Sequence, residues 1–74
     1  MRNEIIEALK KHAEGHIAKH KANVEVLLNK VAGIAEHPDT LETIEKELAI
    51  IAQYDDELEV LNKYFTFKDP LKSN

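Results

Sequence analysis

The chain has 74 residues, no cysteine and a net charge of −4 at pH 7. A chain of this length rarely stabilises a single core without help, and the lack of cysteine excludes disulfides and thiolate metal sites as that help. No apolar run approaches the ~20 residues that span a bilayer, and the N-terminal residues lack the pattern of a signal peptide. We therefore expect a soluble protein of a reducing compartment such as the cytoplasm, with no membrane partner. Because the chain is acidic, no nucleic-acid partner is expected either.

Residues 3–36 are predicted to form a first helix, with Asn3 as its N-cap. Apolar or semi-apolar residues recur there at steps of three and four: Ile6, Leu9, Ala13, Ile17, His20, Val24, Leu27, Val31 and Ile34. This spacing places them on one face of a helix. Gly15 lies off this face, so it lowers helix propensity without interrupting the pattern.

The predicted turn covers residues 37–39. Pro38 does not continue the first helix, and it disfavours the α conformation of the residue before it. Asp39 then caps a second helix over residues 40–66. Residues 67–74 show no helical period and are predicted to be an extended or disordered tail.

The second helix carries two apolar stripes. One runs through Leu41, Ile44, Leu48, Ile51, Asp55, Leu58, Asn62 and Phe65, and the other through Ile50, Tyr54 and Leu61. Together they cover about half of the circumference, which is wider than one partner helix hides. The sequence therefore predicts an all-α fold: a two-helix antiparallel hairpin over residues 1–66 that dimerises into a four-helix bundle. The residues expected in the core or the dimer interface are Ile17, Val24, Leu27, Val31, Leu48, Ile51, Tyr54, Leu58 and Leu61.

Charge is distributed unevenly between the two helices. Residues 1–36 hold six basic and five acidic residues, a balance of +1, whereas residues 39–66 hold two basic and eight acidic residues, a balance of −6. Opposite charges favour pairing of the first helix with the second, within one chain or between chains. This pattern supports self-association through unlike helices.

Folding the chain about the predicted turn gives a register of facing residues. It pairs Ile34 with Leu41, Val31 with Ile44, Leu27 with Leu48, and Val24 with Ile51. One further step brings His20 opposite Asp55, near the centre of both faces. His12, His16 and His20 also recur at one-turn intervals on the first helix.

Three interpretations of this polar layer compete. The favoured one is a hydrogen-bonded pair of His20 and Asp55 that fixes register and oligomeric state. A second is a divalent metal site of His16 and His20 with Asp55 or Glu59, which would make the bundle metal-binding or even a metal-dependent phosphohydrolase-like enzyme. A third is a basic collar for phosphate, formed by residues 10–12 and 19–21, but helical angles split those lysines into two separate strips.

A catalytic interpretation has less support. The acidic residues Asp55, Asp56, Glu57 and Glu59 resemble a carboxylate cluster, but a helix points them in different directions. The chain has no glycine-rich phosphate loop and no serine before Ser73. The sequence therefore predicts a protein that is not an enzyme, without catalytic residues and without a cofactor.

Four short segments give the chain a resemblance to a known family. They are Ala13-Glu14-Gly15-His16, Glu36-His37-Pro38-Asp39, Tyr54-Asp55-Asp56 with Leu58, and Lys63-Tyr64-Phe65. In this order and spacing, over most of residues 5–66, they are similar to small helical proteins of unknown function encoded by marine T4-like cyanophages. The resemblance implies a viral origin and a place in the bacterial host cytoplasm or the virion, and it implies no activity. We expect a phage accessory or interaction protein that binds itself and an unidentified host or phage protein, or else a minor structural component of the phage.

Overall fold

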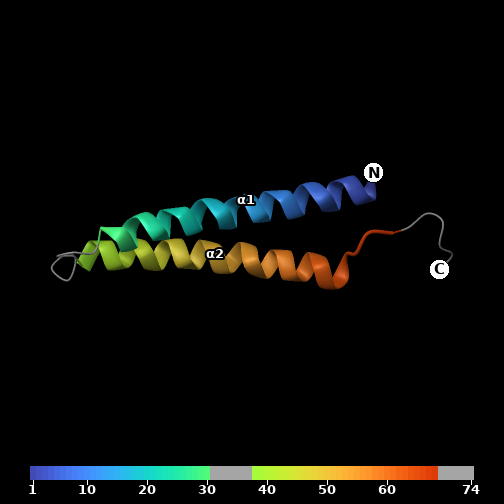
Figure 1. Cartoon of the computed structure of the whole chain (residues 1–74). Coiled ribbons are helices and arrows are strands. Elements are labelled where there is room, and N and C mark those ends of the chain that lie inside the picture. The colour runs from blue at the N-terminus through green and yellow to red at the C-terminus, as the bar shows by residue number, and fades with distance from the viewer. Residues whose placement is uncertain (31–37, 69–74) are drawn as a thin grey trace.

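Two long helices packed side by side make up the fold. The computed structural model describes residues 1–30 and 38–68, which contain α1 (Arg2–Asn29) and α2 (Pro38–Tyr64). The two helices run antiparallel and contact each other along most of their length (Figure 1). This confirms the prediction of an all-α, two-helix hairpin. Neither α1 nor α2 contains an apolar stretch suited to crossing a membrane.

Both helices begin earlier than the sequence predicts. Met1 occupies the N-cap position of α1, so Asn3 lies inside the helix and not at its cap. Pro38 is the first residue of α2, a position that suits proline because the first helical N–H needs no partner. Asp39 therefore lies within the first turn of α2, where its carboxylate faces the positive end of the helix dipole.

The first helix also ends earlier than residue 36. The last helical residue is Asn29, and the N–H of Lys30 donates to the carbonyl of Leu27 at 3.2 Å, which closes a tightened last turn. Residues 31–37, which include the rest of the predicted first helix and the start of the predicted turn, lie outside the described residues. At the other end of the hairpin, α2 stops at Tyr64, two residues before the predicted boundary.

Residues 65–68 leave α2 and turn back onto the beginning of α1. The guanidinium of Arg2 donates to the carbonyl of Thr66 at 2.8 Å. The side-chain amide of Asn3 donates to the carbonyl of Lys68 at 2.9 Å and accepts from its N–H at 3.1 Å. Asn3 therefore ties the two ends of the described chain together. The rest of the predicted tail, residues 69–74, lies outside the described residues.

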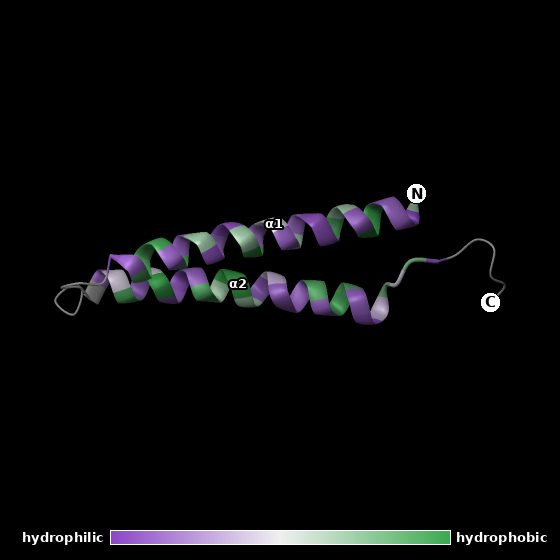
Figure 2. Cartoon of the chain, in the orientation of Figure 1, coloured by the Kyte–Doolittle hydropathy of each residue, from purple (hydrophilic) through white to green (hydrophobic). Residues whose placement is uncertain are grey.

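The core of the single hairpin is small. Among the described residues, Ile6 and Ala13 are the apolar side chains that are buried, with 6% and 1% of their surface exposed. The predicted core residues that lie half-buried on the inner face are Ile17, Val24, Leu27, Ile51, Tyr54, Leu58 and Leu61. Leu48 is 49% exposed, so it lies outside the core of the single hairpin, and its predicted place in a dimer interface stays a prediction. Val31 lies outside the described residues. Figure 2 shows apolar and polar residues alternating along both helices.

The observed register differs from the predicted one by about two helical turns. His20 faces Glu47, and their residue numbers add to 67, as do those of Asn29 and Pro38 at the turn end of the two helices. The predicted pair of His20 and Asp55 adds to 75. The difference has a geometric cause. In an antiparallel hairpin, the end of the first helix and the start of the second determine which residues face each other. Because α1 ends at Asn29 and not near residue 36, each residue of α1 faces a residue of α2 that is closer to the turn than predicted.

Replacing Gly15 by alanine should stabilise the hairpin. A methyl group built at this position meets nothing within 4 Å, and alanine loses less backbone entropy than glycine in a helix. We expect Gly15→Ala to raise the free energy of unfolding by about 1 kcal/mol, measured by urea denaturation. An unchanged or lower value would show that this part of α1 is not helical in solution.

Candidate functional site

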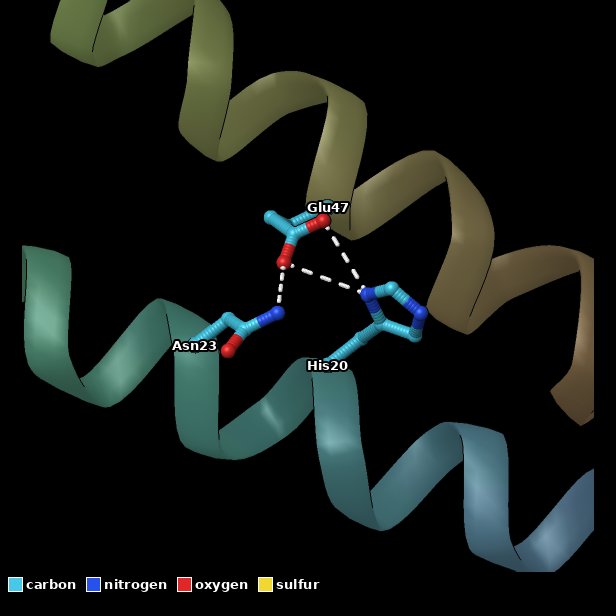
Figure 3. Close-up of polar contacts among 3 residues, drawn as sticks. All are labelled: His20, Asn23 and Glu47. Carbon is cyan, nitrogen blue, oxygen red and sulfur yellow. Dashed lines mark hydrogen bonds and ion pairs between the residues drawn. The ribbon is translucent and has the colours of Figure 1, made fainter.

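A polar layer crosses the inner face of the hairpin where α1 meets α2 (Figure 3). The Nδ1 atom of His20 lies 3.0 and 3.1 Å from the two carboxylate oxygens of Glu47. The side-chain amide of Asn23 donates to the same carboxylate. An ionised carboxylate only accepts hydrogen bonds, so Nδ1 of His20 carries the proton in this pair. The side chains of His20 and Glu47 are 12% and 14% exposed, which limits competition from water.

These hydrogen bonds favour the charged form of Glu47. The amide of Asn23 and then the imidazole of His20 lower the pKa of the Glu47 carboxyl group, against a smaller opposing effect of desolvation. Glu47 therefore stays ionised at neutral pH and accepts from two side chains of α1. The layer joins the helices through charge-assisted hydrogen bonds, which are stronger than neutral ones.

A row of aromatic rings continues from this layer toward the open end of the hairpin. We name His12, His16 and His20 the histidine ladder. The ring of His16 stacks on the ring of Tyr54, with centroids 4.3 Å apart and planes inclined by 8°. His12 meets His16 edge-on at 4.4 Å, and His20 lies parallel to His16 at 5.9 Å. His16 is therefore held between two imidazoles and a phenol ring.

The surroundings of His16 disfavour its protonated form. Its Nδ1 atom is shielded from solvent and has no hydrogen-bond partner among the described residues. Desolvation lowers the pKa of His16, and the neighbouring His12, His20 and Lys19 lower it further, while Glu57 acts in the opposite direction. His16 is consequently neutral at pH 7, because a positive charge there would lose water and meet other cations.

The structure separates the residues of the predicted metal site. His16 and His20 both lie on the inner face of α1, but Asp55 and Glu59 are exposed on α2. The predicted pairing of His20 with Asp55 is therefore wrong, and the shifted register explains why. Within residues 1–30 and 38–68, no three histidine, aspartate or glutamate side chains are grouped closely enough to hold a metal ion.

Asn23 and Glu47 are the functional-site residues that the sequence interpretation missed. Glu47 lies three residues after Ile44 and four before Ile51, so it fits the same helical stripe as the neighbouring Leu48. Hydrophobicity alone favours Leu48 for the inner position. Glu47 takes the inner position because His20 and Asn23 on α1 donate hydrogen bonds to it. The sequence does not identify these partners unless the register is known.

The chain has no match among the known proteins to which it was compared. No protein-family model, no curated protein and no solved structure matches it. The resemblance to cyanophage proteins therefore stays a prediction.

Removing the charge of Glu47 should destabilise the hairpin. Glu47→Gln keeps the length of the side chain but replaces an acceptor of two charge-assisted hydrogen bonds by a neutral amide. We expect a lower Tm in circular dichroism at pH 7 than for Glu45→Gln, the matched control on the exposed surface of α2. Because the Glu47 pKa is lowered by folding, this difference should persist above pH 4.5 and shrink as the pH falls through the lowered pKa. Equal Tm values at pH 7 would contradict the role of the polar layer.

The histidine ladder should make the hairpin less stable in acid. Because folding lowers the pKa of His16, protonation favours the unfolded chain. The contribution of neutral His16 is complete above an ordinary histidine pKa of about 6.5 and is lost as the pH falls below it. We expect the Tm of the wild type to drop between pH 7.5 and pH 5.5, and His16→Phe, which keeps a ring against Tyr54, to lose less.

His12→Phe provides the control for this experiment. His12 is exposed, so its replacement leaves the desolvation of His16 in place and should keep most of the pH dependence. The same drop in Tm for the wild type and for His16→Phe, each measured at one protein concentration, would show that His16 is not the group that responds.

Proposed function

We propose that the chain is a non-enzymatic, self-associating helical protein, two copies of which form an antiparallel four-helix bundle. In this form it serves as a small accessory or interaction protein. The observation that carries the proposal is the amount of apolar surface that one hairpin leaves exposed. The polar layer adds a reason why the assembly would have one defined register.

The exposed apolar side chains outnumber the buried ones. Ile6 and Ala13 are buried, whereas large aliphatic residues of both helices are between 44% and 55% exposed. These exposed residues are Ile5, Leu9, Val26, Leu28, Leu41, Leu48 and Val60. A short chain without disulfides usually compensates for so small a core by association with a partner. Two copies of the hairpin are the simplest partners, because a four-helix bundle gives each helix two neighbours.

The polar layer fits an assembly role better than a catalytic one. A polar group that is largely shielded from water is costly to leave without its hydrogen-bond partner, so a polar layer disfavours every register that separates the partners. His20, Asn23 and Glu47 occupy this position between α1 and α2. A single polar layer of this kind commonly sets the register and oligomeric state of helical assemblies.

Light scattering coupled to size-exclusion chromatography tests the proposal. We expect a solution mass of twice 8.4 kDa at micromolar concentration. The Tm should also rise with protein concentration, because mass action stabilises a dimer. A mass of 8.4 kDa with a Tm independent of concentration would refute self-association.

A further inference from the structure

One side of the hairpin carries an open apolar groove at the end away from the turn. The groove measures about 440 Å³, with Leu9, Val60 and Leu61 as its apolar residues. His12, Gln53 and Glu57 are among its polar residues. Ile5 lies one helical turn before Leu9 and is 53% exposed, so it extends the same apolar surface. We name this surface the groove side.

The opposite side differs at the same end of the hairpin. Its residues at the open end are charged, and Lys11 pairs there with Glu7 and Glu14 at 3.7 and 3.6 Å. The C-terminal segment also covers part of α1, because the ammonium group of Lys10 lies 4.6 Å from the ring centre of Phe67. At this end, the large aliphatic side chains that the two helices leave exposed, Ile5, Leu9 and Val60, therefore lie on the groove side.

Helical geometry distinguishes the two sides. Groove residues such as Leu9 and Val60 come directly before an inner position of their helix, whereas Leu28 and Leu48 come directly after one. Since each residue turns the helix by 100°, residues before and after an inner position lie on opposite sides. The apolar residues Leu28, Leu41 and Leu48 therefore form a second patch, on the opposite side and near the turn.

The position of the groove along the hairpin restricts how a second copy docks on it. Toward the turn, the groove side carries Asn23, Thr43 and Lys46 together with Val26. A two-fold axis parallel to the helices places the apolar open end of one copy against the apolar open end of the other copy. A two-fold axis perpendicular to the helices places the open end of one copy against the more polar region of the other copy. Burial of apolar surface favours the first arrangement.

Charge favours the same arrangement independently. Within the helices, α1 holds five basic and four acidic residues, a balance of +1, and α2 holds two basic and eight acidic residues, a balance of −6. An axis along the hairpin places α1 of each copy against α2 of the other. An axis across it places α2 against α2, which brings two strongly acidic helices together.

The open groove favours this side of the hairpin, and the match of apolar surface and the charge balance favour the axis parallel to the helices. We infer that the second copy docks on the groove side, with both turns at the same end, so that Leu9 of each copy packs near Val60 of the other. This inference rests on the proposed self-association and specifies its surface and symmetry. In the observed register, Leu9 lies level with residue 58 of α2, so Val60 of the second copy is displaced by only two residues, or about 3 Å along the helix.

Cysteine cross-linking tests the arrangement without background, because the chain contains no cysteine. Leu9→Cys and Val60→Cys are purified separately, mixed and oxidised. A disulfide requires Cα atoms within about 7 Å, so the expected main product is a disulfide between one chain of each variant. Leu28→Cys mixed with Leu41→Cys is the matched control, since this pair has similar exposure and the same two-residue offset on the opposite side.

The outcomes separate this inference from the proposal on which it rests. A Leu9→Cys and Val60→Cys heterodimer as the main product, with little product from the control pair, supports the groove arrangement. If the measured mass shows a dimer but the control pair cross-links instead, the groove arrangement is overturned. Cross-linking of Leu9→Cys mainly with itself overturns it as well. A monomeric mass for the wild-type chain overturns self-association itself. Circular dichroism of each variant before oxidation shows that the helices are intact.

Discussion

The hairpin depends on one interface, because two helices have only each other to pack against. In this chain the apolar side chains of that interface are interrupted by polar groups. The interface carries an ionised carboxylate held by His20 and Asn23, and beside it a row of three imidazoles against Tyr54. Each of these groups is costly to desolvate unless its partner is in place. These polar contacts therefore specify which residues of the two helices face each other.

The polar contacts also disfavour other registers of the two helices. Sliding one helix by a turn would leave Glu47 without its donors and would move Tyr54 away from His16, so alternative registers lose contacts that water does not fully replace. Apolar contacts discriminate less, since leucine and isoleucine recur at similar intervals on both helices. The exposed leucine and valine side chains face outward, and the proposed second copy would cover those on the groove side.

The sequence predicts the two helices but not their register. Periodicity and Pro38 are sufficient for an all-α hairpin, because both signals are local. The register is not local, since it depends on where α1 ends, and proline marks the start of α2 without marking the end of α1. When the end of α1 is predicted too late in the chain, the predicted partner of His20 becomes Asp55 and not Glu47. The histidines of the site were predictable from their spacing on one helix. Its carboxylate, Glu47, was not, because identifying it requires the register between the two helices.

Within the proposed arrangement, the histidine ladder runs from the inner face of the hairpin to the dimer interface. His16 is shielded by the rings around it in the single hairpin, so its neutral form is linked to folding. His12 is exposed on the groove side, where it lines the same groove as Asp56 and Glu57. The edge-on contact between His12 and His16 therefore joins the groove side to the group whose protonation opposes folding. A second copy docked on the groove side, as proposed, would pack against the outer member of the same row of rings that shields His16.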